Sequence, residues 1–491
     1  MPGRPSAGTF AGSVHTMKPR LEFLSPTEID TIHACSLKIL KEVGMRFPAP
    51  EALAAFETAG ADIRENEIVR LDESLVENAL KTTRKRGDFI LYARDPAHDI
   101  RFDRHDPGMA CMTMATSVID PKTGEKRAAT QKDLADLVRV AQDLEHVRVA
   151  GGMVTPQDVP LDFCEWHTWA TCLKQTTKHI TDGVTGYQCV RDVMAMAAAV
   201  GGGMGAFLER PFISGWVLTL PPLGMDTGSL EAMMEMNRHH IPIMLSSGPI
   251  LGSTAPVTIP AMVAQAHAEI LACITLSQLI RPGAPVVYTS FARGMNMKTT
   301  NISMAGPEFA VLKVAMAQMG LWLDLPVRMP AMLRDAKILD AQAGFETGMV
   351  GTLAAFNADI MDAMQLDTDM VVDYPDLLFC NDCMAAIRHA LRPVTVDDTT
   401  MAFDLIREIG PGGNFLTSRH TFDNFKTELL HPEILDHDNW ESWAEKGART
   451  IRDKALIRVR GMLAENRDNL VTPAQEQAID AIVAQACKGG K

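Results

Sequence analysis

Residues 284–291 read APVVYTSF, a short apolar run between longer segments of helical pattern. Six more runs repeat this alternation along the chain. A continuous apolar run between helices is typical of a parallel strand buried on both faces, because helices cover both sides of such a sheet. The other six runs are 148–154 (RVAGGMV), 178–184 (KHITDGV), 212–220 (FISGWVLTL), 241–248 (IPIMLSSG), 326–332 (PVRMPAM) and 358–366 (ADIMDAMQL).

An eighth strand is expected further upstream, at 109–118 (MACMTMATSV). It precedes a predicted helix over 131–144, which opens at Thr130-Gln131-Lys132-Asp133. Eight strand–helix units predict an α/β protein with a (β/α)8 TIM barrel. An open, doubly wound parallel sheet is the alternative architecture.

Helical patterns flank the predicted barrel on both sides. Ser25-Pro26-Thr27-Glu28 forms a capping box with proline at the first helical position, and it predicts where the ordered chain begins. The predicted organisation is a disordered extension at 1–19, a helical N-terminal region at 20–104 with some strand around 88–119, the barrel at 105–400 and a helical C-terminal extension at 401–491.

Composition excludes several classes of protein. The net charge is -14, from 47 basic and 61 acidic residues, and no basic patch points to a nucleic-acid partner. The nine cysteines are scattered and odd in number, which argues against a disulfide framework. A membrane span needs about 18 apolar residues in a row, and no such run is visible. Residues 1–17 lack the apolar segment of a signal peptide. We therefore expect a cytoplasmic protein with no membrane or nucleic-acid partner.

The first candidate site residues follow the run at 284–291. In a TIM barrel the site lies at the C-terminal ends of the strands. Tyr288, Phe291, Arg293 and Asn296 lie at such an end. An aromatic face can bind a quaternary ammonium, and an arginine fork matches a carboxylate. Tyr288 and Phe291 are three positions apart, so both reach the site only if the strand ends before Phe291. We predict that all four bind substrate, with core packing as the alternative for the two aromatic residues.

A second group of candidates follows the run at 326–332, and one more residue follows the last run. Arg334, Asp335 and Lys337 could instead be an ordinary cluster of charged side chains exposed to solvent. Asp340 is also placed to cap the helix that follows it. The predicted set is Arg334, Asp335, Lys337 and Asp367 for substrate binding, and Asp340 and Gln342 for catalysis.

A metal site is a weaker possibility. Cys380-Asn381-Asp382-Cys383 is a lone CxxC, and zinc would need a second pair of ligands. Cys164 and His167 offer one, far away in the sequence. A zinc site with a thiol acceptor therefore stays an alternative, while the main interpretation has no metal.

Long stretches of the chain resemble the trimethylamine methyltransferase family. The resemblance runs from about residue 22 to 465 and is much more specific than any short motif. The matching stretches include LSPTEIDTIHACSLKILKEVGMRF, TGEKRAAT, GSTAPVTIPAMVAQAHAEILACITLSQLIRPGAPVVY, AGPEFA, DAKILDAQAG and the GGNFL of the tail.

This resemblance implies a TIM barrel and a methyltransferase. Family members move a methyl group from a methylamine to the cobalt of a separate corrinoid protein. Founding members carry pyrrolysine in the barrel, whereas this chain has ordinary residues in the corresponding region, roughly 329–334 (MPAMLR). Members without pyrrolysine resemble demethylases of quaternary amines such as glycine betaine. The segment DAMQLDTDMVVDYPDLLFCND departs from common relatives at a strand end.

The chemistry implied by the resemblance asks little of the protein's own side chains. A quaternary nitrogen leaves as a neutral tertiary amine and needs no proton. The protein has to orient one methyl group and exclude water. We therefore expect no tightly bound cofactor, a cognate corrinoid protein as methyl acceptor, a small quaternary amine as substrate and a homo-oligomer. A protein that binds the amine without turnover is the remaining alternative.

Overall fold

The computed structural model describes residues 20–103, 105–112, 114–465 and 469–489. The segment predicted to be disordered, 1–19, lies outside the described residues.

Eight parallel strands close into a barrel. They follow one another around the barrel in chain order, and the last strand, β17, pairs with the first, β6. This closing pair confirms the TIM barrel, and the open-sheet alternative is wrong. Each predicted apolar run overlaps one barrel strand. The strands are β6 (Gly108–Ala110), β9 (Val147–Ala150), β10 (His179–Gly183), β11 (Ile213–Leu218), β12 (Ile243–Ser247), β13 (Val286–Ser290), β16 (Val327–Leu333) and β17 (Ile360–Gln365).

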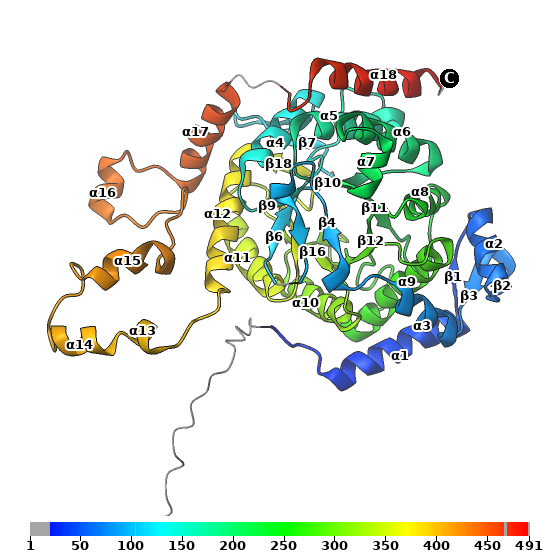
Figure 1. The fold of residues 1–491 in the computed structure, drawn as a ribbon, viewed down its shortest axis with the longest axis horizontal. Coiled ribbons are helices and arrows are strands. Elements are labelled where there is room, and N and C mark those ends of the chain that lie inside the picture. The colour runs from blue at the N-terminus through cyan, green and yellow to red at the C-terminus, as the bar shows by residue number, and fades with distance from the viewer. Residues whose placement is uncertain (1–19, 104, 113, 466–468, 490–491) are drawn as a thin grey trace, which may run out of the picture.

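A ring of helices surrounds the barrel (Figure 1). The first begins at a capping box, in which the Thr130 hydroxyl accepts a hydrogen bond from the Asp133 amide and the Asp133 carboxylate accepts one from the Thr130 amide. The ring consists of α4 (Gln131–Asp143), α5 (Cys164–Gln175), α6 (Gly186–Val200), α8 (Thr227–Arg238), α9 (Ile259–Ile280), α10 (Pro307–Trp322), α11 (Ala341–Ala355) and α12 (Tyr374–Ala390), with the short α7 (Met204–Glu209) after α6.

Helix α9 is apolar on all sides because it is covered on all sides. Within the described residues it is the one helix long and apolar enough to cross a membrane, yet 83% of its apolar window is buried. Helices α1 (Pro26–Glu42), α2 (Pro50–Thr58) and α3 (Glu73–Thr82) pack against it from outside. Its composition is therefore that of a core helix.

The N-terminal region mixes helices with two small sheets. The predicted capping box at Ser25 and Glu28 is present and starts α1. One sheet contains β1 (Met45–Arg46), β2 (Asp62–Arg64) and β3 (Ile68–Arg70). The other is the hairpin of β4 (Ile90–Leu91) and β5 (Ile100–Arg101). Short 3₁₀ helices of this region lie at Glu65–Glu67, Arg86–Asp88 and Pro96–His98, and another lies at Leu161–Phe163, directly before α5.

The β4–β5 hairpin closes the amino-terminal end of the barrel. Its Leu91 and Ile100 pack in one cluster with Met244, Val287 and Ile360, which lie at or near the starts of their strands. A ligand therefore reaches the barrel interior from the carboxyl ends of the strands.

Two groups of short strands lie at the carboxyl end of the barrel. These are the sheet β7 (Ser117–Ile119), β8 (Lys126–Ala128) and β18 (Val371–Asp373), and the hairpin of β14 (Gly294–Met295) and β15 (Ile302–Ser303).

The C-terminal region leaves the barrel after α12 and returns to it. Helix α17 packs against α12, and α18 packs against α5 and α6. The helices between α12 and α17 in the chain lie outside the ring, at the left of Figure 1. The C-terminal helices are α13 (Asp398–Met401), α14 (Phe403–Ile409), α15 (Arg419–Glu428), α16 (Trp440–Glu445), α17 (Ile451–Ala464) and α18 (Pro473–Gly489).

Candidate active site

A cavity of about 380 Å³ opens at the carboxyl ends of the barrel strands. Its volume and mostly apolar lining are those of a site for a small molecule. Its position is that of the active site in a TIM barrel. The residues that shape its chemistry are Cys111, Glu165, Thr181, Asp182, Trp216, Phe291, Arg293 and Arg328.

Phe291 and Arg293 lie together in this cavity, directly after β13. The guanidinium carbon of Arg293 is 5.4 Å from the centroid of the Phe291 ring. Lys313 of α10 fixes this segment, because its Nζ donates to the carbonyl oxygens of Ser290 at 2.7 Å and Ala292 at 2.8 Å. A buried lysine that hydrogen-bonds the main chain on both sides of Phe291 holds the ring and the following arginine in place.

The Arg293 guanidinium has no hydrogen-bond partner among the described residues, and its Nε is buried. Burial lowers the pKa of Arg293, and the nearby Asp369 opposes that shift. A buried donor without an acceptor is costly, so such a group at a cavity wall is suited to receive an anion.

Arg328 is the second cation of the cavity and is already paired. Its Nε donates to Oδ1 of Asp362 at 2.9 Å, and its Nη2 donates to the Cys111 carbonyl oxygen at 3.2 Å. Its guanidinium carbon lies 4.4 Å from the centroid of Trp216. Trp216 in turn meets Phe291 edge-on, with 6.3 Å between the ring centroids. The two aromatic rings and the two guanidinium groups thus form one continuous wall.

Carboxylates supply negative charge to the same cavity. Asp182 is held by the main chain, since its Oδ2 accepts from the Gly152 amide at 2.7 Å and its Oδ1 from the Gly183 amide at 2.8 Å. Glu165 accepts from the amide and the hydroxyl of Thr185. A ligand that has both a cationic and an anionic group fits such a lining.

Asp369 lies near Arg293, in a segment of strained backbone. Asp367, Thr368 and Asp369 all have positive φ, from 53° to 68°. Both carboxylate oxygens of Asp369 are buried without a hydrogen-bond partner among the described residues. Burial raises the pKa of Asp369 to about 8, although Arg293 acts in the opposite direction. Backbone strain of this kind gathers at functional sites.

The structure places Tyr288 away from the cavity. Strand β13 ends at Ser290, before Phe291. This was the condition for Tyr288 and Phe291 to reach the site together. However, Tyr288 faces the helix layer, where its hydroxyl lies 2.9 Å from Nδ1 of His267. A Cβ on Gly320 of α10 would come within 2.9 Å of the Tyr288 ring. The alternative of a core aromatic therefore describes Tyr288.

Arg334 also points outward. It is fully buried between the barrel and the helices, where it pairs with Asp376 of α12 and donates to Thr347 Oγ1 at 3.2 Å. Of the two arginines predicted from the sequence, Arg293 is the one that reaches the cavity.

The other predicted residues lie in the loops around the mouth, except Gln342, which lies in the first turn of α11. Asn296 is exposed in the turn of the β14–β15 hairpin. Asp335 accepts from Ser303 Oγ and from the Met304 amide. Asp367 pairs with Lys337 and Lys126. Asp340 caps α11 by accepting from the Gln342 and Ala343 amides, and the Gln342 side chain donates to Glu346.

Sequence reasoning missed three cavity residues, two of which had a readable signal. Asp182, Trp216 and Arg328 each lie inside an apolar run that was predicted as a strand. A charged residue in the middle of a buried strand is expensive unless it is paired or functional. Applied to the sequence alone, that rule singles out Asp182 and Arg328.

Cys380 and Cys383 have no second pair of zinc ligands near them among the described residues. Burial raises the pKa of Cys383 to about 12 and that of Cys380 further, which keeps both thiols protonated. Among the described residues, no three His, Cys, Asp or Glu side chains converge as metal ligands would. The zinc alternative therefore has no support.

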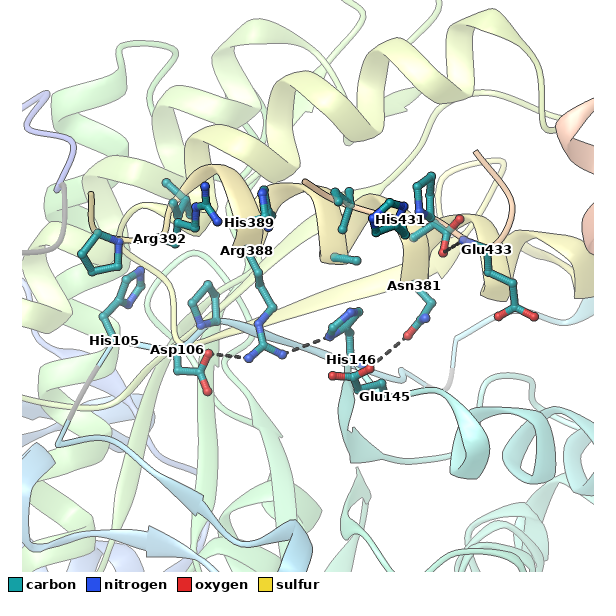
Figure 2. Close-up of a pocket in the computed structure, with 17 residues that line it drawn as sticks. His105, Asp106, Glu145, His146, Asn381, Arg388, His389, Arg392, His431 and Glu433 are labelled. Atoms are coloured by element: carbon teal, nitrogen blue, oxygen red, sulfur yellow. Dashed lines mark hydrogen bonds and ion pairs between the residues drawn. The ribbon is translucent and has the colours of Figure 1, made fainter. Parts of the chain in front are cut away.

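A larger cavity, of about 560 Å³, lies at the other end of the barrel (Figure 2). It is lined by residues that precede β6 and β9, by the last turns of α12 and the residues that follow it, and by residues 430–433. Its charges are occupied with one another, because Arg388 bridges Asp106 and the ring of His146. The position, at the amino ends of the strands, is associated with stability rather than catalysis in this fold.

The barrel and its mouth cavity define a (β/α)8-barrel enzyme that acts on a small molecule. The family model described as Trimethylamine methyltransferase (MTTB) matches residues 4–490. The chain therefore belongs to the trimethylamine methyltransferase family and is a methyltransferase.

Two relatives agree with this assignment. A trimethylamine methyltransferase of Desulfitobacterium hafniense is 30% identical over 435 residues, which cover 88% of this chain and 87% of the relative. A glycine betaine methyltransferase of the same species is 30% identical over 471 residues, 94% of this chain and 96% of the relative. Among solved structures, the monomethylamine methyltransferase of Methanosarcina barkeri gives a TM-score of 0.47 at 12% identity, over 95% of this chain and 93% of that one.

Proposed function

We propose that this methyltransferase demethylates a quaternary amine that also carries a carboxylate, glycine betaine or a related betaine. The observation that carries the proposal is the Arg293 guanidinium, which has no hydrogen-bond partner among the described residues and lies beside Phe291 in the mouth cavity. The name of the glycine betaine relative supports the same substrate class.

The substrate carboxylate pairs with Arg293 in this proposal. Arginine presents a planar fork of donors that matches a carboxylate, and the pair is stronger in a partly dry site. Arg328 adds positive charge nearby, although Asp362 offsets much of it.

The trimethylammonium group lies against Trp216 and Phe291. Aromatic faces attract quaternary ammonium ions, and the attraction reaches about 2 kcal/mol when the pair is desolvated. Asp182, which lines the same cavity, adds a fixed negative charge. The ligand then has its carboxylate at Arg293 and its ammonium group between the aromatic rings and Asp182.

The methyl acceptor is the corrinoid of a cognate partner protein, which supplies a cobalt(I) nucleophile. The bond from nitrogen to the methyl carbon breaks, its electron pair stays on nitrogen, and a neutral tertiary amine leaves. No proton has to move, so the side chains of this chain orient the methyl toward the open end and exclude water. The carboxyl-end opening leaves the acceptor a route to that methyl.

Three further features belong to the proposal. The corrinoid stays with its own protein, and this chain holds no cofactor tightly. The protein forms a homo-oligomer. It works in the cytoplasm, which agrees with the burial of α9, the one helix among the described residues that is long and apolar enough to cross a membrane.

The test is methyl transfer to a reduced corrinoid, followed by the loss of cobalt(I) absorbance. Glycine betaine and longer betaines should react, whereas choline and trimethylamine should react poorly. Trimethylamine is mostly protonated at neutral pH, and this chain has no pyrrolysine to engage it. Equal turnover of trimethylamine would contradict the proposal. Binding of a betaine without transfer to any corrinoid would favour the binding-only alternative.

A further inference from the structure

Glu269 is a buried carboxylate in the most apolar helix of the protein. The sequence of α9, IPAMVAQAHAEILACITLSQLI, contains no other Asp, Glu, Lys or Arg. The Glu269 side chain is fully buried in the layer between the helices and the barrel. A buried carboxylate costs folding free energy that an apolar side chain of similar size would not cost. Its presence in a core helix therefore calls for a role other than packing.

Glu269 accepts four hydrogen bonds, two at each oxygen. Its Oε1 accepts from the Leu223 amide at 2.9 Å and from the side-chain amide of Gln265 at 3.1 Å. Its Oε2 accepts from the Thr219 hydroxyl at 2.6 Å and from the Ser247 hydroxyl at 2.8 Å. None of these four partners is a cation. The carboxylate is therefore held by hydrogen-bond donors alone, and in turn it holds them.

Two of these partners belong to the segment 219–223, which follows β11. Residues 219–221 line the mouth cavity. Ser247 is the last residue of β12, and the next residue, Gly248, lines the cavity as well. Glu269 itself is not among the lining residues. It thus fastens one stretch of the cavity wall to α9 from behind.

The same contacts extend to the loop after β12 and to Phe291. The Gln265 side chain donates both to Glu269 and to the Thr254 carbonyl oxygen, the latter at 2.9 Å. A Cβ on Gly248 would lie 3.2 Å from the Cβ of Phe291, so the wall packs directly against this aromatic residue. A shift of the wall would therefore change the space beside the Phe291 ring.

We propose that Glu269 is a positioning residue for methyl transfer, which fixes the cavity wall at 219–223 and so limits the room around the substrate. This inference rests on the proposed function, in which the ammonium group lies against Trp216 and Phe291. Transfer depends on holding one methyl group in line with its acceptor, and small displacements of the substrate cost much of the rate. A wall fixed by four hydrogen bonds restricts the orientations that the ammonium group can take.

The first test is substrate selectivity. Glu269→Met removes all four hydrogen bonds but keeps an unbranched side chain of similar length. The measurement is kcat/KM for glycine betaine and for (N-ethyl-N,N-dimethylammonio)acetate, which is larger by one methylene. The ratio of the two values should shift toward the larger substrate by at least about 10-fold, because a rigid pocket discriminates one methylene by this much. A smaller amount of folded enzyme cannot change this ratio, since it lowers both values equally.

The conservative variant Glu269→Gln separates position from charge. Its amide oxygen can accept from Leu223 and Gln265, and its NH₂ can donate to the hydroxyls of Thr219 and Ser247, because hydroxyls also accept. The ratio should therefore stay at the wild-type value. A Gln variant that changes selectivity as much as the Met variant would overturn the proposal, because the charge and not the position would then be needed.

Glu235 provides a matched control. It is a buried carboxylate of α8 that pairs with Arg191 and Arg238, and none of these three residues is among those that line the cavity. Glu235→Met should lower stability in urea and leave the selectivity ratio unchanged. An equal change of the ratio in this control would mean that any buried carboxylate has the same effect, which would also overturn the proposal.

Hydrogen exchange tests the wall without any substrate. Peptides that cover 219–225 should exchange at least about 10-fold faster in Glu269→Met, because the Leu223 amide loses its acceptor and the segment opens locally. They should exchange as in the wild type in Glu269→Gln. Unchanged exchange in Glu269→Met overturns the inference, and so does an unchanged selectivity ratio in a protein that demethylates betaines. A wild type whose exchange follows these expectations but which demethylates no betaine contradicts the proposed function instead.

Discussion

Arg328 lies over the indole of Trp216, with 4.4 Å between the guanidinium carbon and the ring centroid. Because the same guanidinium is tied to Asp362 and to the Cys111 carbonyl, it fixes the plane of the indole. One face of Trp216 is thereby occupied by a cation that belongs to the protein. The cavity has a rigid aromatic wall before any ligand arrives, which lowers the entropic cost of binding.

The first prediction concerns Trp216. The Trp216→Leu variant should bind glycine betaine about 2- to 30-fold more weakly, because a cation–π contact is worth about 0.5–2 kcal/mol. The measurement is calorimetric affinity, with 3,3-dimethylbutanoate as a second ligand that has carbon in place of the charged nitrogen. The loss should be absent for this analogue, which keeps the carboxylate but has no cationic group.

Trp322 provides the matched control for this change. It lies on α10 against His33, remote from the cavity, and Trp322→Leu should leave both affinities unchanged. A Trp216 variant that loses affinity for glycine betaine and for 3,3-dimethylbutanoate equally would point to shape rather than to cation binding.

The second prediction concerns Arg293. The Arg293→Gln variant should lose about 10- to 150-fold in kcat/KM for a betaine, since a charge-assisted hydrogen bond contributes about 1.5–3 kcal/mol. Choline lacks the carboxylate, so its weak binding should not change. If choline and betaine lose affinity together, the guanidinium is not the carboxylate contact.

The third prediction concerns pH and Asp369. The unfolded chain releases this proton near pH 4, whereas in the folded protein burial raises the pKa of Asp369 to about 8. The folded state holds more protons between these values, so the free energy of unfolding should fall as pH rises, by up to about 1.4 kcal/mol per pH unit. Above about pH 8 this contribution is lost.

Replacing the carboxyl removes that dependence. The Asp369→Asn variant should be more stable than the wild type at neutral pH, and its stability should vary less between pH 5 and 8 in urea titrations. Asp367→Asn, two positions away in a partly exposed ion pair, should change stability by under about 1 kcal/mol. A wild-type stability that rises with pH over this interval would contradict the assignment.

Sequence pattern predicted the barrel well because the signal is repeated eight times. A strand buried on both faces has to be apolar along its length, and this requirement holds at every strand of a closed parallel barrel. The helix starts at Ser25 and Thr130 were equally readable, because a capping box is a local arrangement of hydrogen bonds.

The site was predicted only in part, because strand ends do not reveal where side chains point. Phe291 and Arg293 line the mouth cavity, but Tyr288 turns outward with the alternation of its strand. Arg334 looked equally suited to bind a carboxylate, yet its partner Asp376 is 42 residues away in the sequence. Pairing over such distances is set by the fold and cannot be read from the loop alone.

The fourth prediction separates two roles of Asp340. Its carboxylate accepts from the Gln342 and Ala343 amides and caps α11, so Asp340→Ala should cost about 0.5–2 kcal/mol of stability. Asparagine caps helices about as well as aspartate, so Asp340→Asn should keep the stability. If the carboxylate is catalytic, turnover should be lost in both variants. If it only caps the helix, stability and turnover should fall only in the alanine variant. We expect methyl transfer to follow stability and to survive in Asp340→Asn, with unfolding in urea measured beside turnover in the same preparation. Loss of turnover in a fully stable Asp340→Asn protein would instead assign Asp340 to the chemistry, and Gln342→Ala should then be tested in the same assay.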